Sequence, residues 1–157
     1  MKTLIIYYSY GGNTKRIAEM IQKETGGDLA EIETVIPYSG DYNTIVEQGQ
    51  AEVNSGFMPD IKPLDVDAGA YDRIILGSPV WWYTFAPAVK TFLAQTDFKG
   101  KEVFPYATNG GWLGHTFKDL ARECKGAIVK KGMDIKFDEH QLNTSETKIL
   151  QWIKSIA

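Results

Sequence analysis

The chain has 157 residues, of which 43% are hydrophobic and 24% charged, and its net charge at pH 7 is −3. This length suits one domain over residues 1–157, with enough apolar material for a core. No apolar run reaches the roughly 18 residues that a membrane helix needs, and no basic run indicates nucleic-acid binding. The N-terminus carries no recognisable secretion signal, so we expect a cytoplasmic protein without membrane or nucleic-acid partners.

The single cysteine, Cys124, cannot form an internal disulfide, and no metal-ligand spacing surrounds it. We expect it to be a small buried helix residue rather than a metal ligand or a nucleophile.

In the first part of the chain, an apolar run over residues 4–8 predicts a strand that is buried on both faces. Residues 13–25 carry apolar side chains at helical spacing and predict the first helix. Residues 29–35 alternate as a half-exposed edge strand would. The stretch over residues 37–63 is irregular, and we expect one helix within it, near residues 43–53.

Further along, residues 73–77 predict a third buried strand, and Pro87 suits the first turn of a helix over residues 87–95. Residues 102–108 predict a fourth strand. Pro105 lies within it and removes a ladder hydrogen bond, so we expect a bulge or a local gap there.

The last part of the chain continues the same alternation. A helical stripe over residues 117–124 is followed by a fifth strand over residues 127–137, which we expect to be interrupted near Gly132. Asn143 and Glu146 have the spacing of a capping box for a final helix. This repeated strand–helix order predicts an α/β fold with a doubly wound, five-stranded parallel sheet and right-handed crossovers.

Ligands of such sheets bind outside the carboxyl ends of the strands, and three segments of unusual composition fall there. The first, after the first strand, comprises Ser9, Tyr10, Gly11, Gly12, Asn13 and Thr14. Its small residues let the backbone approach an anion, and free N–H groups with the helix dipole favour a phosphate. A plain helix N-cap with turn glycines is the alternative. Neither a dinucleotide fingerprint nor a nucleoside triphosphate loop is present.

The second segment comprises Ser78, Pro79, Val80, Trp81, Trp82, Tyr83 and Thr84. Three consecutive aromatic side chains cannot all point into the core, and a planar ligand would give them a stacking partner. An aromatic lid over the sheet end or a subunit contact is the alternative.

The third segment comprises Thr108, Asn109, Gly110, Gly111, Trp112, Leu113, Gly114 and His115. Three glycines in so short a stretch suggest close approach of the backbone to a ligand, although a turn that only reverses the chain is also open. His115 is interpreted either as a solvent-facing residue at the start of a helix or as a ligand contact.

Taken in order, these segments resemble the phosphate loop and the two flavin loops of short-chain, flavodoxin-like proteins. The S-Y-G-G-N-T run is similar to their usual Ser/Thr-x-Thr-Gly-Asn-Thr pattern, except that Gly11 replaces a hydroxyl residue. The resemblance spans nearly the whole chain. It implies the strand order 2-1-3-4-5 and non-covalently bound FMN, with no catalytic acid, base or nucleophile supplied by the protein. The cofactor-binding residues that it implies are Ser9, Tyr10, Gly11, Gly12, Asn13, Thr14, Pro79, Val80, Trp81, Trp82, Tyr83, Thr108, Asn109, Gly110, Gly111 and Gly114.

The resemblance also implies electron transfer, with redox partner proteins or a small-molecule acceptor, by a monomer or weak dimer. An NAD(P)H-dependent quinone reductase, or a related FMN reductase on the same fold, stays open as the alternative. A non-redox binding module is a third possibility. A phosphoacceptor receiver domain would need carboxylates where this chain has Tyr8-Ser9 and Gly77-Ser78.

One property of the second segment bears on the redox chemistry that the resemblance implies. Flavodoxin-like carriers favour one-electron reduction through a peptide flip beside the flavin, and glycine makes that flip cheap. Residues 80–83 contain no glycine, and a bulky residue at positive φ costs about 1–3 kcal/mol. We therefore expect poor stabilisation of the one-electron reduced state, with a flip supplied by Gly110 or Gly111 of the third segment as the alternative.

Overall fold

The computed structural model describes residues 2–156, which form an α/β fold around a mostly parallel sheet. The strands follow the spatial order β2-β1-β3-β5-β7-β8, which confirms the order 2-1-3-4-5 for the five principal strands. These strands are β1 (Thr3–Tyr7), β2 (Asp28–Glu31), β3 (Arg73–Trp81), β5 (Glu102–Asn109) and β7 (Met133–Asp138). The short strands are β4 (Thr84–Phe85), β6 (Ile128–Val129) and β8 (Gln141–Leu142).

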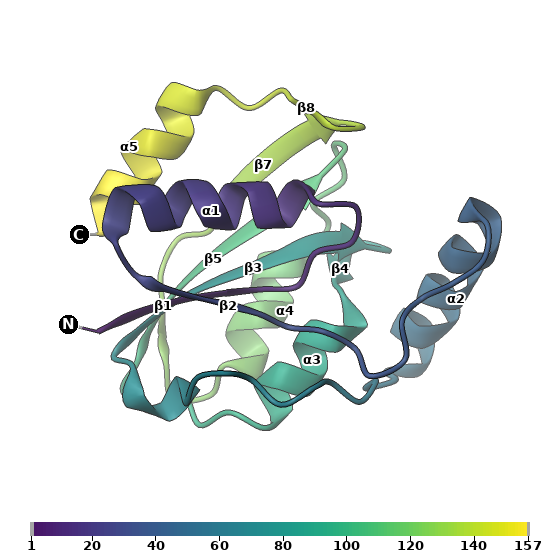
Figure 1. The fold of residues 1–157 in the computed structure, drawn as a ribbon, viewed down its shortest axis with the longest axis horizontal. Helices are drawn as coiled ribbons and strands as arrows, with labels where there is room; N and C mark the ends of the chain where they lie inside the picture. The colour runs from purple at the N-terminus through teal and green to yellow at the C-terminus, as the bar shows by residue number, and fades with distance from the viewer. Residues whose placement is uncertain (1, 157) are drawn as a thin grey trace.

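Helices cover both faces of the sheet, as Figure 1 shows. One face is covered by α1 (Asn13–Thr25) and α5 (Glu146–Ile156), and the other by α3 (Pro87–Ala94) and α4 (Thr116–Glu123). A short 3₁₀ turn, η1 (Ala68–Ala70), precedes β3. The remaining helix, α2 (Tyr42–Ser55), lies past the carboxyl ends of the strands (Figure 1).

The core consists of two apolar layers, one on each face of the sheet. In β1, Leu4 and Ile6 contribute to the layer beneath α3 and α4, while Ile5 and Tyr7 contribute to the layer beneath α1 and α5. Because both faces are covered, the central strands are near-continuous apolar runs rather than alternating ones. Among residues 2–156, no helix is long and apolar enough to cross a membrane.

The second strand is shorter than the sequence suggested. Its pairing with β1 ends at Tyr7 opposite Glu31, because β1 itself ends there and the next segment is bent. Thr34 then forms an isolated antiparallel bridge with Ile61, so the end of the expected strand pairs with a later loop instead of the sheet.

Pro105 is accommodated by a gap on one side of β5. Pairing with β3 runs unbroken through Leu76 opposite Pro105, whereas on the other side β6 pairs up to Val103 and β7 resumes at Tyr106. The expected local gap is therefore present, and it coincides with the expected interruption of the fifth strand into β6 and β7. At Gly132, within that interruption, an added Cβ would lie 2.6 Å from the Phe117 ring.

The third strand differs most from the expectation, which ended it at Gly77. In the structure β3 continues to Trp81 and turns back into β4, with Val80 opposite Phe85. Gly77 therefore lies inside the strand and not at its end. A glycine is needed there because an added Cβ would lie 2.1 Å from Cζ of the buried Tyr106 ring. The sequence missed this hairpin because its two turn residues are aromatic, whereas tight hairpin turns usually contain Asn or Gly.

Two smaller expectations concern helix ends. The last helix begins at Glu146, and the Ser145 carbonyl accepts a hydrogen bond from the Ile149 N–H at 3.2 Å, so Asn143 lies outside the helix. Cys124 ends α4 and is buried, as expected. Burial, together with the charge of Glu123, raises the pKa of its thiol to about 12, so the thiolate that reacts as a nucleophile is not populated near neutral pH.

Candidate functional site at the carboxyl edge of the sheet

The carboxyl ends of β1 and β3 face a cavity of about 620 Å³ beneath α2, which we call the edge cavity. This volume falls in the range of small-ligand and cofactor sites. The first predicted segment and the β3–β4 hairpin supply part of its wall, and α2 with the residues around it supplies the rest. The lining residues are Tyr10, Gly11, Gly40, Tyr42, Ile45, Val46, Gly49, Val80, Trp81, Trp82 and His140.

The segment that opens α1 leaves its N-terminal backbone groups available to a ligand. Gly11 and Gly12 have φ values of 87° and 99°, which glycine adopts without steric cost. Gly12 is the N-cap of α1 and provides no side-chain cap hydrogen bond, and Ser9 Oγ caps only the third N–H of the helix, that of Lys15, so the N–H groups of Asn13 and Thr14 stay available. A Cβ on Gly12 would meet no protein atom within 4 Å. This open, N–H-rich turn is suited to an anion.

Side chains of the same segment are largely engaged within the protein. The Thr14 hydroxyl is buried and lies 2.8 Å from the Thr108 hydroxyl, which ties the first predicted segment to the third. Asn13 Nδ2 donates to the Glu139 carbonyl at 2.7 Å, and the backbone N–H of Lys15 donates to Ser9 Oγ at 3.2 Å. The backbone N–H groups are therefore better placed than these side chains for a first contact with a phosphate.

Aromatic rings form the inner wall of the edge cavity. Trp81 packs edge-on against Tyr8 and Tyr38, with ring centroids 5.9 Å and 5.1 Å away, and Tyr10 stacks on Tyr38 at 6.4 Å. The Tyr38 hydroxyl donates to Glu52 at 2.6 Å. Burial is the main cause that raises the pKa of both Tyr8 and Tyr38, so both phenols stay protonated near neutral pH. Trp81 and Tyr10 line the cavity, and the protonated Tyr8 and Tyr38 rings pack behind them.

The tip of the hairpin carries two non-glycine residues in the left-handed region, Trp82 at φ 51° and Tyr83 at φ 70°. Both side chains are exposed. Trp82 Nε1 donates to the Val46 carbonyl of α2 at 3.3 Å, and the His115 backbone N–H donates to the Tyr83 carbonyl at 2.9 Å. From the sequence, positive φ is expected to be costly for the bulky residues 80–83. The structure already holds two of them, Trp82 and Tyr83, at positive φ.

The third predicted segment contacts the hairpin but does not line the edge cavity. Asn109 Nδ2 donates to Asp134 at 2.6 Å, and the Gly111 N–H donates to Asn109 Oδ1 at 2.9 Å. An added Cβ on Gly114 would lie 2.3 Å from the Tyr83 carbonyl oxygen, which explains why a glycine occupies this position. Trp112 is highly exposed.

Comparison with known proteins decides the family. A family model described as Flavodoxin matches residues 2–156, which is nearly the whole chain. The chain belongs to the flavodoxin family. This assignment confirms the resemblance of the three segments, and it covers the full α/β fold rather than the loops alone.

Solved structures with this flavodoxin fold cover almost the entire chain. A candidate flavoprotein from Bacteroides eggerthii is 31% identical with a TM-score of 0.83, covering 99% of this chain and 97% of that one. A flavoprotein from Lactobacillus acidophilus, solved in complex with FMN, is 27% identical with a TM-score of 0.76, covering 96% and 97%.

Among curated proteins, Flavodoxin 1 of Escherichia coli K12 is 30% identical over 109 residues, which are 64% of this chain and 46% of that protein. The alignment thus spans about half the length of the curated flavodoxins that the chain matches.

Sequence reasoning missed several residues that line the edge cavity of this flavodoxin-family chain. Gly49 of α2 approaches Trp81 so closely that an added Cβ would lie 3.3 Å from Cε3 of the indole. His140, in the β7–β8 turn, places Nδ1 3.3 Å from Asn13 Oδ1. A glycine in the exposed helix α2 was a weak signal of close packing, but the position of His140 depends on the tertiary fold and left no local signal. Tyr42, the first residue of α2, also lines the cavity.

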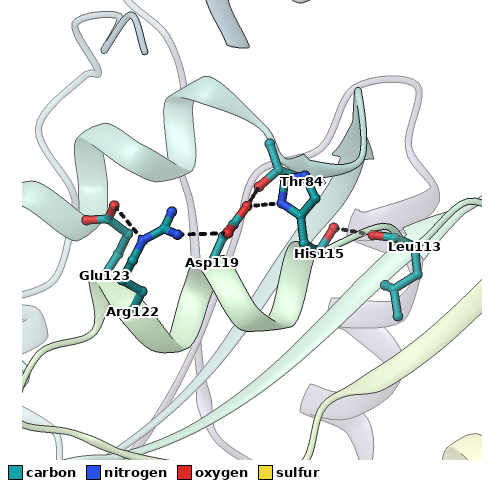
Figure 2. A network of polar contacts seen from close by, with 7 residues as sticks. Thr84, Leu113, His115, Asp119, Arg122 and Glu123 are labelled. Atoms are coloured by element: carbon teal, nitrogen blue, oxygen red, sulfur yellow. Dashed lines mark hydrogen bonds and ion pairs between the residues drawn. The ribbon is translucent and has the colours of Figure 1, made fainter. Parts of the chain in front are cut away.

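A polar network connects α4 to the hairpin (Figure 2). Asp119 accepts hydrogen bonds from the Thr84 hydroxyl, at 2.6 Å, and from His115 Nδ1, and Arg122 Nη1 lies 3.2 Å from its second oxygen. Burial raises the pKa of the Asp119 carboxyl, but the hydrogen bonds from Thr84 and His115 and the charge of Arg122 outweigh it, so the pKa is lowered overall. Asp119 is therefore a charged residue of α4 that holds the hairpin against this helix through its contacts with Thr84, His115 and Arg122. Within residues 2–156, no group of three or more His, Cys, Asp and Glu side chains could hold a metal ion.

Proposed function

We propose that this chain is a single FMN-binding domain, residues 1–157, that transfers electrons. The observation that carries the proposal is the edge cavity, which brings the glycine turn before α1 next to a wall of aromatic rings. FMN presents the matching pair of features, a charged phosphate and a planar ring system. Membership of the flavodoxin family and the FMN complex of the Lactobacillus relative support the choice of cofactor.

Each part of the site has a proposed task. The backbone from Ser9 to Thr14 binds the phosphate, where N–H groups and the helix dipole stabilise negative charge. Trp81 and Trp82 contact the ring from the hairpin, and Tyr10 contacts it from the first segment. The third segment holds the hairpin in place through Gly114. Bound FMN supplies the chemistry of one- and two-electron transfer, and the protein binds, orients and shields it.

The partners we propose are redox proteins or a small-molecule electron acceptor. The single thiol of Cys124 is buried and unpaired, which supports residence in a reducing compartment such as the cytoplasm. An NAD(P)H-dependent quinone or related FMN reductase is the second candidate function. A further cavity beside Trp82 favours it, because a reductase needs a place for a small substrate next to its cofactor.

The cofactor is tested by purifying the protein, recording its absorbance and identifying the released compound by mass spectrometry. We expect yellow protein that releases FMN, because the cavity has one phosphate-binding turn and the sequence has no dinucleotide fingerprint. Full occupancy by FAD, or a colourless protein that does not take up FMN, would contradict the proposal.

Steady-state assays separate the two functions. An electron carrier exchanges electrons with protein partners but shows no sustained NADPH oxidation with a quinone. Multiple turnovers with NADPH and a quinone would assign the chain to the reductases instead.

A further inference from the structure

A second cavity, of about 370 Å³, shares Trp82 with the edge cavity. We call it the side cavity. Its walls are the C-terminal turn of α2, the start of α3, one side of α4 and the β3–β4 hairpin. The volume lies at the lower end of the range of small-molecule sites, enough for a ligand with one or two rings.

A hydrogen-bond donor with spare capacity, the Lys90 ammonium, lines this cavity. Lys90 makes no ion pair with any residue from 2 to 156, and its Nζ has only a long contact, 3.4 Å, to the Gly56 carbonyl. His115 donates from Nδ1 to Asp119 (Figure 2), so Nε2 of a neutral imidazole carries a lone pair and gives a bound anion no hydrogen bond. A half-buried ammonium without a carboxylate partner has a net favourable interaction to gain from a bound anion.

The acidic groups in the same walls, Glu52, Asp119 and Glu123, are by contrast already engaged, and Glu123 Oε1 lies 3.9 Å from Arg122 Nε (Figure 2). Asp119 accepts from Thr84 and His115 and pairs with Arg122 (Figure 2). Glu52 accepts from the Tyr38 hydroxyl at 2.6 Å and from Gln48 Nε2 at 2.8 Å. The unmatched polar group that the cavity offers to a ligand is therefore the cation of Lys90.

Aromatic side chains supply the apolar part of the side cavity. Phe57 and Trp82 line it with about half and two-fifths of their surfaces exposed, at 50% and 39%, and Phe85 lies buried behind them. An exposed pair of large aromatic side chains in a concave site is suited to a planar ring.

We propose that the side cavity binds a small planar organic anion, an aromatic ring bearing a carboxylate, with the carboxylate on Lys90 and the ring against Trp82. This site goes beyond cofactor binding, because Lys90 and Phe57 take no part in the proposed FMN site and Trp82 is the residue that the two sites share. Since the Trp82 side chain lines both cavities, the ligand contacts a residue that also faces the proposed flavin ring.

The test is a calorimetric titration of the FMN-loaded protein with 2-naphthoate and with its neutral analogue 2-naphthamide. Binding is located by the NMR signal of the Trp82 indole N–H, assigned with the variant Trp82→Phe. We expect saturable binding of 2-naphthoate, a shift of the Trp82 signal, and about ten-fold weaker binding of 2-naphthamide, because a charged hydrogen bond is replaced by a neutral one.

Matched variants distinguish the site from general charge attraction. Lys90→Met keeps most of the side-chain stem, and we expect it to weaken 2-naphthoate about ten-fold and to remove the preference over 2-naphthamide. Lys118→Met removes an exposed lysine of α4 that does not line the cavity, and we expect no change. Thermal unfolding of both variants checks that the fold is kept.

Several outcomes would overturn the proposal. They are the absence of saturable binding, equal affinity for acid and amide, an unchanged affinity in Lys90→Met, and release of FMN by 2-naphthoate, which would place the ligand in the edge cavity. If the protein does not bind FMN at all, the same titration on the purified protein still tests the side cavity, so the two proposals fail separately.

Discussion

Two turns at the same edge of the sheet each place consecutive residues at positive φ, and they do so by different means. After β1, Gly11 and Gly12 adopt φ values of 87° and 99°. At the hairpin tip, Trp82 and Tyr83 adopt 51° and 70°. Glycine has no Cβ and adopts these values freely, whereas other residues lose about 1–3 kcal/mol each.

The difference lies in what holds each turn. The glycine turn needs no support from its neighbours and leaves open space at Gly12. The hairpin tip is held by hydrogen bonds from three sides, from the His115 N–H to the Tyr83 carbonyl, from the Trp82 indole to α2, and from the Thr84 hydroxyl to Asp119. One turn is shaped by its own composition and the other by its surroundings. Substitutions around the hairpin should therefore disturb it from a distance.

The largest expected effect is that of Gly114→Ala. An added Cβ would lie within 2.3–2.6 Å of the Tyr83 backbone and side chain, and Gly114 itself has φ +59°. We expect the free energy of unfolding to fall by about 3 kcal/mol or more, from combined overpacking and backbone strain. Urea unfolding monitored by circular dichroism measures it.

Gly100→Ala is the matched control for this substitution. Gly100 also has positive φ, at +77°, but a Cβ there meets nothing within 4 Å. We expect only the backbone cost, about 1 kcal/mol. Equal losses in the two variants would show that contact between Gly114 and the hairpin is unimportant.

In the glycine turn, Thr14→Ala should weaken FMN binding and also lower stability. The substitution removes a hydroxyl of the proposed phosphate-binding turn, whose proton is free for the phosphate when the Thr108 hydroxyl donates to it, and leaves the buried Thr108 hydroxyl without its partner. We expect about a 10–150-fold loss of FMN affinity, from a charged hydrogen bond of roughly 1.5–3 kcal/mol. Titration of the FMN-free protein with FMN measures the dissociation constant, and Thr14→Ser should restore it. A dissociation constant that does not change in Thr14→Ala would remove this hydroxyl from the phosphate site.

The polar contacts of Asp119 that hold the hairpin against α4 are tested by Asp119→Asn. Loss of the charge weakens the contacts with Thr84, His115 and Arg122, and we expect unfolding free energy at pH 7 to fall by about 2 kcal/mol. Because the pKa of Asp119 is lowered in the folded state, its contribution is complete above the unfolded value near about 4 and is lost as pH falls through the folded value. The difference in unfolding free energy between the wild type and Asp119→Asn should therefore decrease as the pH falls. A difference that stays constant from pH 7 to pH 3 would show that the charge of Asp119 has no part in it.

The smallest expected effect concerns the strain at the tip itself. Tyr83→Gly and Tyr83→Ala remove the same exposed side chain, but only glycine is relaxed at φ 70°. We expect the glycine variant to be more stable than the alanine variant by about 1 kcal/mol, measured by urea unfolding. An alanine variant of equal or greater stability would indicate that the turn relaxes to another conformation.

The sequence predicted the helices and the glycine turn because each depends on local composition and periodicity, whereas the strand order came from the resemblance of the three segments to flavodoxin-like proteins. The gap in strand pairing beside Pro105 was also predicted, because proline has no backbone N–H to donate. The hairpin did not follow, since Trp82 and Tyr83 are held in their turn by His115 and α2, which are distant in the chain. For the same reason the approach of His140 to Asn13 became visible only in the folded chain.

The position of α2 links ligand binding to local folding. Only Gly49 and Glu52 of this helix are buried, and its attachment to the hairpin includes the close approach of Gly49 to Trp81 and the indole of Trp82 on Val46. These contacts are also walls of the edge cavity. A ligand that fills the cavity therefore stabilises this position of α2, and amide hydrogen exchange in the helix should slow when the site is occupied. Affinity for the cofactor then includes the free energy of ordering this helix, and substitutions on its exposed face that raise helix propensity should tighten binding without contacting the ligand.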